Sequence, residues 1–483
     1  MDLHQFLRAA EAAGWLVLYE RQVDPVLEIA RIAAELDGQP VLFTHVKGSA
    51  YPVVIGVCSD RRYFGMALGC PADQVIFRLA EALPTPPAPL PEKEGGGVLP
   101  SPGRGGAGGE VAPCQEVIEP EVNLESIPFL THYATDAGPY ASAAVAFIND
   151  PDTGPNASYH RLLRLDRTRV AARLVERRGT ETAWRKTFGD SKSQLPTQSL
   201  PAQAPSGPAQ SAQADCAEVA AVSDRRDGLP VAICIGLPLH VLLAASMAPP
   251  PGVDEMSIAQ ALAPTPMVAC ANGIRVPAEA EFVLEGRITR RLASEGPFVD
   301  LTGTYDFVRQ QPIIEIDRVT HRRDAIYQAL LPGRLEHRLL MGMPREPTIY
   351  AEVNKVARCL NVNVTPGGAS WLHAVVQIAK QAPDDGLRAI AAAFRGHGSL
   401  KHVWVVDEDV NPLDPHDVEW AVATRFQADR DLVVLTDQPS SSLDPSARHT
   451  PGQKSRTAKM GLDATVPWDT PAGPSDPGAY RRV

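Results

Sequence analysis

The sequence lacks any apolar run long enough to cross a membrane. No stretch of its 483 residues approaches the roughly 18 consecutive apolar residues of a membrane-spanning helix. The first residues also lack the basic and then apolar layout of a secretory signal. These absences predict a cytoplasmic protein with no membrane partner.

Cysteine is scarce as well. The seven cysteines are odd in number and are never spaced as C-x-x-C. That pattern indicates neither a disulfide framework nor a zinc cluster. Cys234 and Cys270 lie within apolar runs, and we expect them to be small buried side chains.

Positive charge is in the minority. Lys and Arg number 46 against 57 Asp and Glu, a formal net charge of −11 without a long basic run, which argues against nucleic acid as the main partner. No P-loop, G-x-S-x-G or H-E-x-x-H motif occurs, and the literal G-x-G-x-x-G match at residues 103–108 lies inside a Pro/Gly-rich stretch rather than between a strand and a helix. Dinucleotide-binding, nucleotide-hydrolysing and serine-hydrolase functions therefore have no support in the sequence.

The chain is long enough for about three domains. Helical periodicity at residues 2–13 and 25–35 alternates with β-rich apolar runs, which predicts an N-terminal α/β domain over residues 1–113. Within it, residues 84–110 are so rich in Pro and Gly that we expect a flexible linker or surface loop.

Residues 114–325 contain mostly strand-like segments and predict a β-rich middle domain. A Ser/Gln/Pro/Ala tract at residues 191–228 interrupts this domain. Its composition cannot bury enough apolar surface to offset the entropy of ordering. We therefore expect a disordered insertion without a catalytic role.

The third domain is expected over residues 326–483. Helices predicted at 371–383 and 386–396 alternate with strands predicted at 401–409 and 431–436, a pattern typical of an α/β domain. The Pro/Ser-rich stretch from Pro439 is expected to be extended. The whole chain is thus predicted to be an α+β multidomain protein.

Two segments carry candidate binding and acid–base residues. Asn156 follows a turn at 150–155 and precedes a β-like run with Arg161, an arrangement that suits clamping of a phosphate or carboxylate, although ordinary surface arginines fit it too. Glu295 and Asp300 flank a Gly-Pro turn. Two carboxylates brought close together repel each other, which poises one of them as a general acid, but surface turn carboxylates are far commoner.

A third segment, residues 242–262, breaks a helix-like stretch at a proline run and places Glu255 near the start of the next. Loop carbonyls and one carboxylate suit a hard cation, and a carboxylate favoured by a helix N-terminus explains Glu255 equally well. Among the histidines, His321 and His373 fit structural roles. His337, in a basic segment after a Pro-Gly break, is the best functional candidate.

Taken in order, these segments resemble the UbiD family of reversible decarboxylases, which use prenylated FMN. The resemblance begins at PCQEVIEPEVNLESIPFLTHYATDAGPYASAAVAFINDPDTGPNASYHR and covers most of the chain outside residues 84–110 and 191–228. It implies a central split β-barrel that holds the flavin, between an N-terminal α/β domain and a C-terminal α/β domain that mediates oligomerisation. It also implies a homodimer or homohexamer whose cofactor comes from a flavin prenyltransferase.

The resemblance also implies roles for particular residues. The Glu-Arg-Glu/Asp network of the family matches Arg161, Glu295 and Asp300, with Asp300 as the acid that protonates the substrate carbon after CO₂ leaves. A divalent ion, manganese or magnesium, matches Asn156 and Glu255, and a potassium ion matches the backbone carbonyls of Ala244, Ala245 and Met247. The residues expected to bind the cofactor are Asn156, Ser158, Tyr159, His160, Arg161, Arg173, Arg177, Arg178 and Lys459.

One departure from the family concerns the metal. Family members carry a histidine ligand some twenty residues after the asparagine, whereas residues 171–184 contain no histidine. Arg177 or Arg178 falls there instead. Either an arginine contacts the flavin phosphate directly, or the metal is held by Asn156, Glu255, phosphate and water.

The expected reaction is decarboxylation of an aromatic or heteroaromatic acid. Furan-2,5-dicarboxylate is the first choice, because His337 and Arg345, eight residues apart, can meet a second carboxylate. Decarboxylation of a phenolic or acrylic acid is an alternative. A catalytically weak accessory subunit and a flavin-dependent reductase are the readings from other classes, the latter without a nucleotide fingerprint in the sequence.

Overall fold

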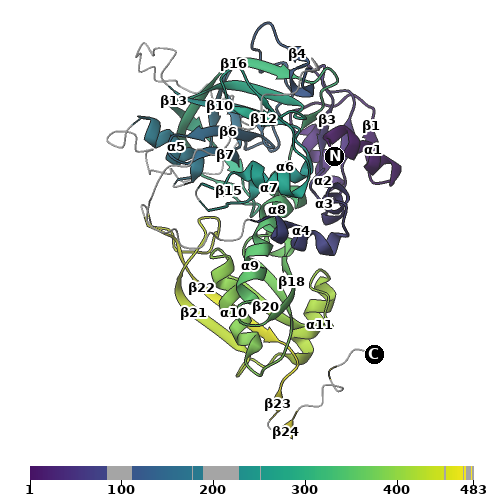
Figure 1. The fold of residues 1–483 in the computed structure, drawn as a ribbon, viewed down its shortest axis with the longest axis vertical. Helices are drawn as coiled ribbons and strands as arrows, with labels where there is room; N and C mark the ends of the chain where they lie inside the picture. Colours follow the sequence, from purple (N-terminus) through teal and green to yellow (C-terminus); the bar gives the residue numbers. More distant parts are fainter. Residues whose placement is uncertain are drawn as a thin grey trace, which may run out of the picture.

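The computed structural model describes residues 1–83, 111–176, 178–188, 228–250, 252–450, 453–470, 473–474 and 480. Residues 84–110, Arg177 and all of the 191–228 tract except Gly228 lie outside this description, so the expectations about them stay predictions. Figure 1 shows three parts, a purple N-terminal region beside a blue-green β-rich body and a green-yellow C-terminal lobe below them.

The N-terminal domain contains a small sheet flanked by helices, as the sequence predicts. The sheet has the order β1-β2-β3-β17, in which β17 (Tyr327–Gln328) comes from beyond the middle domain and pairs in parallel with β3. The other elements are α1 (Leu3–Ala12), β1 (Val17–Tyr19), α2 (Glu28–Glu35), β2 (Val41–Phe43), β3 (Val53–Ile55), α3 (Arg61–Leu68), η1 (Ala72–Gln74) and α4 (Val75–Ala82).

A nine-stranded sheet with the order β5-β8-β9-β16-β13-β10-β6-β7, and β4 beside β16, forms the middle domain. Its longest strands are the antiparallel neighbours β13 (Phe282–Glu295) and β16 (Arg309–His321). The others are β4 (Val117–Ile118), β5 (Tyr140–Ala141), β6 (Val145–Asp150), β7 (Gly154–Tyr159), β8 (Leu162–Arg164), β9 (Arg169–Ala172) and β10 (Leu229–Ile235).

Short elements attached to this sheet carry most of the candidate residues. Two helices follow β10 and lie between the sheet and the C-terminal lobe in Figure 1, α6 (Leu239–Ser246) and α7 (Glu255–Leu262). A hairpin of β14 (Phe298–Val299) and β15 (Tyr305–Asp306) connects β13 with β16. The remaining elements are η2 (Pro113–Gln115), α5 (Gly179–Phe188), β11 (Met267–Ala269) and β12 (Arg275–Pro277).

The C-terminal lobe is a five-stranded sheet with the order β18-β19-β20-β22-β21 and helices against it. Its elements are α8 (Leu335–Gly342), η3 (Met343–Arg345), α9 (Glu346–Val353), β18 (Arg358–Val364), η4 (Pro366–Gly368), β19 (His373–Ala379), α10 (Asp385–Gly396), β20 (His402–Asp407), α11 (Pro415–Arg425), β21 (Leu432–Pro439), β22 (Arg456–Ala464), β23 (Asp469–Thr470) and β24 (Gly473–Pro474).

Two expectations about this lobe need correction. The helix predicted at residues 371–383 is wrong, because this segment forms strand β19, which lies between β18 and β20. A strand buried on both faces has apolar residues on both, so its pattern does not alternate and is easily mistaken for a helix. The stretch beyond Pro439 supplies β22, a strand inside the sheet rather than only an extended tail.

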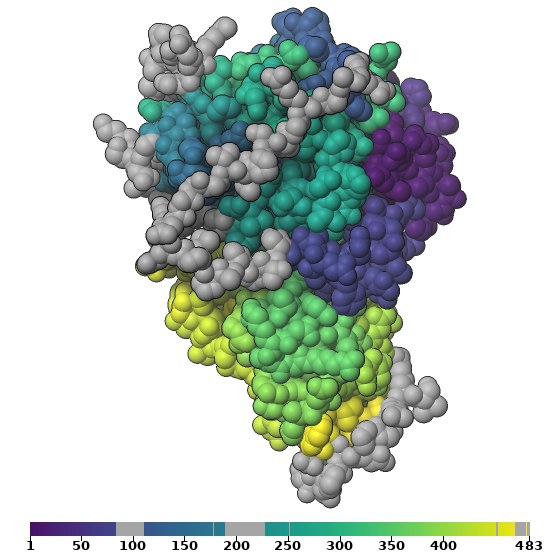
Figure 2. All heavy atoms as spheres, viewed as in Figure 1, coloured from purple at the N-terminus to yellow at the C-terminus, as the bar shows by residue number. Residues whose placement is uncertain are grey.

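The N-terminal and middle domains share one apolar core. Leu3 and Phe6 of α1 are fully buried in the same cluster as Leu242 and Leu243 of α6, whereas the sheet of the C-terminal lobe has a cluster of its own. Cys234 and Cys270 are buried in the shared core, which confirms their predicted structural role. In Figure 2 the lobe forms the narrower lower part of the molecule.

Candidate active site

A network of charges surrounds Arg161, which lies between β7 and β8. Its Nε donates to Glu295 Oε1 at 2.8 Å and its Nη2 donates to Glu295 Oε2 at 3.0 Å, so the two side chains form a bidentate pair. Glu295 ends β13, is fully buried and also accepts a hydrogen bond from the Tyr140 hydroxyl at 3.2 Å. The predicted contact between Arg161 and Glu295 is therefore present in the structure.

The hairpin β14–β15 completes this network. Asp300 follows β14 and places Oδ2 3.6 Å from Arg161 Nη1, which is an ion pair but not a hydrogen bond. Its other oxygen accepts from the Leu301 N–H at 2.6 Å. The ring of Phe298, on the same hairpin, packs under the Arg161 guanidinium at 4.8 Å. The three residues predicted to act together are therefore brought together.

Sequence reasoning missed a fourth member, Asp306. This residue ends β15 and accepts from Arg161 Nη2 at 2.8 Å. Burial of Arg161 opposes its charge, but the carboxylates of Glu295 and Asp306 outweigh burial and raise the pKa of the guanidinium. The signal in the sequence was the hairpin itself, since the register that pairs Phe298 with Asp306 places Asp306 on the strand opposite Asp300.

Asn156 and Glu255 meet where β7 approaches the start of α7. Asn156 Nδ2 donates to Glu255 Oε1 at 3.0 Å, and the Ala157 N–H donates to Glu255 Oε2 at 3.0 Å. Burial raises the pKa of Glu255 to about 7. A carboxylate buried in this way, with an amide and, among the residues that the structure describes, no cationic partner, is suited to a cation.

The position next to Asn156 is a glycine where a side chain would not fit. A Cβ on Gly179, the first residue of α5, would lie 2.9 Å from the amide atoms of Asn156. Among the described residues no group of three or more His, Cys, Asp and Glu side chains could hold a metal. The described side chains therefore offer a divalent ion two oxygen ligands, from Asn156 and Glu255, fewer than such an ion takes.

The other side chains of β7 divide between its two faces. Ser158 Oγ lies 2.9 Å from Thr180 Oγ1 and 3.1 Å from His160 Nε2, so these three polar groups extend the surface beside Asn156. Burial lowers the pKa of His160. Tyr159 points the other way, into the core shared with the N-terminal domain, and is not brought to the Asn156 site.

A second cluster of charges consists of cations. Arg345 Nη2 donates to the Ser246 carbonyl at 3.0 Å, and Lys459 Nζ donates to the Gly398 carbonyl at 2.8 Å. Burial, with the charge of Arg178 second, lowers the pKa of Arg345 to about 10. Burial also lowers the pKa of Lys459 to about 8. Within the described part of the chain, neither side chain forms an ion pair with a carboxylate.

His397 belongs to the same cluster. It is 7% exposed, and its Nε2 has no hydrogen-bond partner among the described residues. Burial and the charges of Arg345, Lys459 and Arg178 lower its pKa to about 3. The Nε of Arg345 is likewise buried without a described partner. Buried donors and cations without an anion fit a bound anion such as a phosphate.

His337 lies near the carboxylate network around Arg161 rather than in the cation cluster. Burial lowers the pKa of His337, the Asp300 charge opposes this, and the charges of Arg161 and Arg338 lower it further. His337 Nδ1 accepts from the Gly333 N–H at 3.1 Å, and Gly333 packs against the backbone of Asp300. Arg345 instead binds the Ser246 carbonyl and stacks over the ring of Trp371, so the described contacts of the two residues are with different partners.

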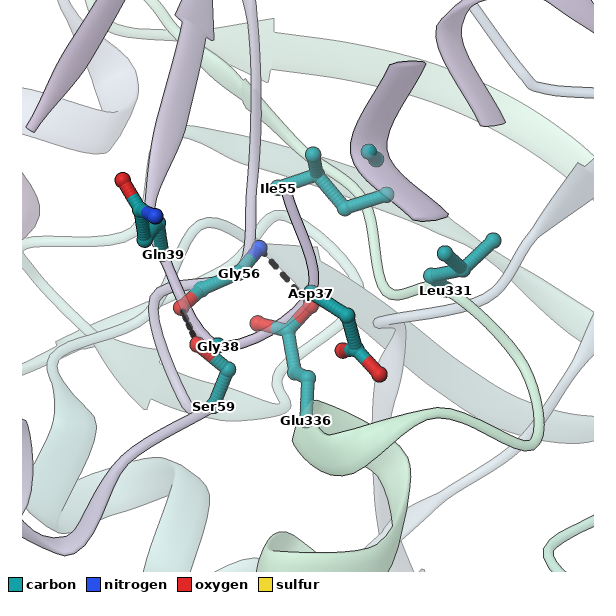
Figure 3. A pocket seen from close by; sticks show the side chains of 9 residues that line it. Asp37, Gly38, Gln39, Ile55, Gly56, Ser59, Leu331 and Glu336 are labelled. Carbon is teal, nitrogen blue, oxygen red and sulfur yellow. Dashed lines mark hydrogen bonds between the residues drawn. The ribbon is translucent and has the colours of Figure 1, made fainter. Parts of the chain in front are cut away.

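Helix α8, which carries His337, is anchored by the preceding residue. The two oxygens of Glu336 accept the N–H groups of Gly56 and Cys58 at 2.9 and 3.0 Å. Burial raises the pKa of Glu336 to about 7. In Figure 3 this side chain points across a small pocket toward Gly56, near Asp37. The pocket has a volume of about 10 Å³, which is room for one water and too small for a substrate. The role of Glu336 is therefore to anchor α8 to the N-terminal domain.

The remaining predicted residues lie nearby with other partners. Arg173 Nε is 3.9 Å from Asp306 Oδ2, which places it at the edge of the carboxylate network. Ala244 and Ala245 end α6 and Met247 follows it. The Ala244 carbonyl accepts from the Met247 N–H at 3.1 Å. Arg345 binds the adjacent Ser246 carbonyl, so a cation already occupies part of the loop expected to hold potassium.

Comparison with known families covers almost the whole chain. Residues 7–83, 108–335 and 338–464 match the N-terminal, Rift-related and C-terminal domains of 3-octaprenyl-4-hydroxybenzoate carboxy-lyase. The chain is 39% identical to anhydromevalonate phosphate decarboxylase of Methanosarcina mazei over 468 residues, 96% of each chain. No helix in the described residues combines the length and apolar character needed for a membrane span.

Solved structures agree. The UbiD-class enzyme HmfF from Pelotomaculum thermopropionicum, in complex with FMN, has a TM-score of 0.82 and 34% identity, with 100% of this chain and 97% of that chain covered. An evolved dimeric form of HmfF in complex with prFMN has a TM-score of 0.76 and 32% identity, with 96% and 95% covered. The fold and site therefore define a carboxy-lyase. The chain belongs to the UbiD family of decarboxylases, as its resemblance predicts.

Proposed function

We propose that this decarboxylase removes CO₂ from an unsaturated acid that carries a phosphate, and that it uses prenylated FMN. Anhydromevalonate phosphate, the substrate named for the Methanosarcina mazei relative, is the first compound to test. The observation that carries the proposal is the Arg161 network. Arg161 binds Glu295 by hydrogen bonds, whereas Asp300 lies outside hydrogen-bond distance of the guanidinium.

Asp300 is the proton donor in this proposal. When the carboxylate leaves as CO₂, the substrate carbon must gain one proton in its place, and a carboxyl group that cycles between its two states can deliver it. Glu295 is held by two hydrogen bonds from Arg161 and is less free to do so. The flavin, when bound, supplies the chemistry of C–C bond cleavage.

The cofactor phosphate is proposed to lie between the cation cluster and the N-terminus of α5. Arg178, Arg345 and Lys459 supply positive charge. Asn156 and Glu255 would hold a divalent ion, manganese or magnesium, that bridges to the phosphate. This arrangement follows the second of the two readings of the missing histidine, in which Asn156, Glu255, phosphate and water hold the ion. A potassium ion at the α6 loop stays a prediction.

Arg338 provides a group for the phosphate of the substrate. It adjoins His337, its Nε is buried without a described partner, and its one described side-chain hydrogen bond, to the Pro366 carbonyl, is long at 3.5 Å. The guanidinium lies beside the Asp300 loop, where a Cβ on Gly303 would be 3.7 Å from Nη2. An under-used guanidinium at this position suits an anionic group of the substrate, such as a phosphate.

Furan-2,5-dicarboxylate is the second candidate. Its support is the predicted pairing of His337 with Arg345 on one distal carboxylate, and the two residues have no described hydrogen-bond partner in common. His337 with Arg338 could still receive that carboxylate. The diacid therefore belongs in the same assay as the phosphorylated acid.

The test requires the loaded enzyme. We would co-express the chain with a flavin prenyltransferase and measure CO₂ release from anhydromevalonate phosphate, from its dephosphorylated acid and from furan-2,5-dicarboxylate. We expect kcat/KM to be highest for the phosphorylated acid, and Arg338→Met to remove most of its advantage over the dephosphorylated acid. A preference for the diacid would make furan-2,5-dicarboxylate the substrate in place of the phosphorylated acid. The absence of CO₂ release from every unsaturated acid tested would refute the decarboxylase function. A homodimer or homohexamer is expected on gel filtration.

A further inference from the structure

Arg161 divides its donors unequally among three carboxylates. Two of its N–H groups bind Glu295, and Nη2 also binds Asp306 Oδ2 at 2.8 Å. Nη1 faces Asp300 at 3.6 Å, too far for a hydrogen bond. The guanidinium therefore lies between two anions that it binds and one that it only approaches.

Asp306 is built to stay ionised. Burial works against its charge, but Arg161, Arg309 and Arg173 outweigh burial and lower the pKa of its carboxyl group. Its Oδ1 lies 2.6 Å from Arg309 Nη1 and accepts from the Phe307 N–H at 2.9 Å. Its side chain is 13% exposed. A carboxylate fixed in this way is an anchor for Arg161 rather than a group that exchanges protons.

One hairpin presents both aspartates to Arg161. Asp300 follows β14, Asp306 ends β15, and the pair Phe298↔Asp306 sets the spacing between them. The turn is closed by hydrogen bonds from the Asp300 N–H to the Thr304 carbonyl at 2.9 Å and from the Gly303 N–H to the Asp300 carbonyl at 2.8 Å. The two carboxylates thus compete for one guanidinium from fixed positions.

We propose that Asp306 is a positioning residue that holds the Arg161 guanidinium on Glu295 and Asp306 and thereby keeps Asp300 free to carry a proton. The inference deepens the proposed function, because it rests on Asp300 as proton donor. A carboxylate bound by an arginine is stabilised in its ionised form and gives up its ability to act as an acid near neutral pH. Asp306 prevents that by holding Nη2, which keeps Nη1 beyond hydrogen-bond distance of Asp300.

Replacement of Asp306 by Asn should favour the ionised form of Asp300 in two ways. In the Asp306→Asn variant, Nη2 keeps Glu295 Oε2 but loses its second anionic acceptor, so the guanidinium can shift until Nη1 binds Asp300. One negative charge near Asp300 is also lost, which again stabilises the ionised form. A general acid works while protonated. The basic limb of the pH profile of kcat/KM should therefore move to lower pH, by about one to two pH units.

The experiment compares Asp306→Asn with two matched variants. Asp306→Glu keeps a carboxylate and should restore most of the wild-type profile. Asp317→Asn removes the same charge from an exposed residue of β16 that pairs with Arg287 at 2.7 Å, and should leave the profile unchanged. A crystal structure of Asp306→Asn should show Arg161 within hydrogen-bond distance of Asp300, a result that does not depend on turnover.

The outcomes separate this inference from the proposed function. An unmoved basic limb, or a guanidinium that stays away from Asp300 in the variant crystal, overturns the role of Asp306. A uniform loss of rate at every pH, with Arg161 unmoved, assigns Asp306 to simple structural support and also overturns it. If Asp300→Asn turns over normally, the proton donor assignment fails instead. If the wild type releases no CO₂, the proposed function fails, while the crystal structure still decides whether Asp306 restrains Arg161.

Discussion

The two charged regions of the site differ in how fully their charges are paired within the protein. Around Arg161, one guanidinium meets three carboxylates, and the closest contacts are hydrogen bonds of 2.8 to 3.0 Å. Around Arg345, Lys459 and His397, buried cations and donors have carbonyl partners or none among the described residues. The first region satisfies itself within the protein. The second carries a desolvation cost that its carbonyl and aromatic-ring partners offset in part and that an external anion would offset further.

The difference assigns separate tasks to the two regions. A closed network can hold charges in fixed positions and reserve one carboxyl group for proton transfer. An open cluster of cations can bind the phosphate of a cofactor. Variants of the first region should therefore affect turnover with the flavin retained, and variants of the second should affect flavin retention.

The largest effect is expected for Asp300→Asn. The amide nearly matches the carboxyl group in shape but cannot deliver a proton, so kcat should fall by about 100-fold or more. Flavin content, measured by absorbance after gel filtration, should equal that of the wild type. Near wild-type turnover would direct the search for the donor to Glu295. Loss of flavin would contradict the separation of the two regions.

Glu255→Ala tests the opposite case. Removal of the buried carboxylate leaves Asn156 as the one described side-chain ligand for the bridging ion, so we expect FMN affinity to fall by about 100-fold together with the metal content. Fluorescence titration and elemental analysis measure the two quantities. Full retention of both would refute the ion site at Asn156 and Glu255. Glu279→Ala is a suitable control, because Glu279 is a carboxylate elsewhere in the same domain.

The sequence anticipates most of the fold. Expected strands at residues 15–20, 401–409 and 431–436 correspond to β1, β20 and β21, since each joins a clear apolar run to turn residues at its ends. The segment at 371–383 was misassigned because an internal strand has no polar face. The order of strands within each sheet could not be predicted, and neither could the contribution of β17 to the N-terminal sheet.

The site shows the same limit at the scale of single residues. Arg161, Glu295 and Asp300 were identified through family motifs, and the structure brings them together. Asp306 has no motif of its own, and its role depends on the register of a short hairpin. The contact of Arg345 with the Ser246 carbonyl was likewise hidden, because the two residues are 99 positions apart in the sequence.

Arg345→Met should have a smaller effect than Glu255→Ala. The variant keeps much of the buried volume but removes one charge-assisted contact, so we expect FMN to bind about 10- to 100-fold more weakly while the apo protein folds normally. Arg395→Met is the matched control, because Arg395 is on exposed α10 and contacts Glu352 at 3.7 Å. Equal FMN affinity in the two variants would remove Arg345 from the phosphate site. A raised KM for the substrate with unchanged FMN binding would instead assign Arg345 to the substrate site.

The smallest effect is a pH dependence that sharpens the contrast between the regions. Burial, with the charge of Lys454 second, lowers the pKa of Lys459 to about 8. The ammonium form binds phosphate, so FMN affinity should be constant below this pH and fall as the pH rises through it, by up to about tenfold at pH 9. Fluorescence titration with FMN at pH 7, 8 and 9 measures this. The FMN phosphate is already a dianion over that range, so it adds little dependence of its own.

Lys459→Arg is the decisive control for that profile. A guanidinium keeps its charge at pH 9, so the variant should bind FMN almost equally at all three pH values, whereas Lys459→Met should bind weakly at all of them. A wild-type affinity that does not change between pH 7 and 9 would mean that Lys459 lies outside the phosphate site. The cation cluster would then consist of Arg345 and Arg178 beside a neutral His397, and the open region would hold its anion by arginine alone.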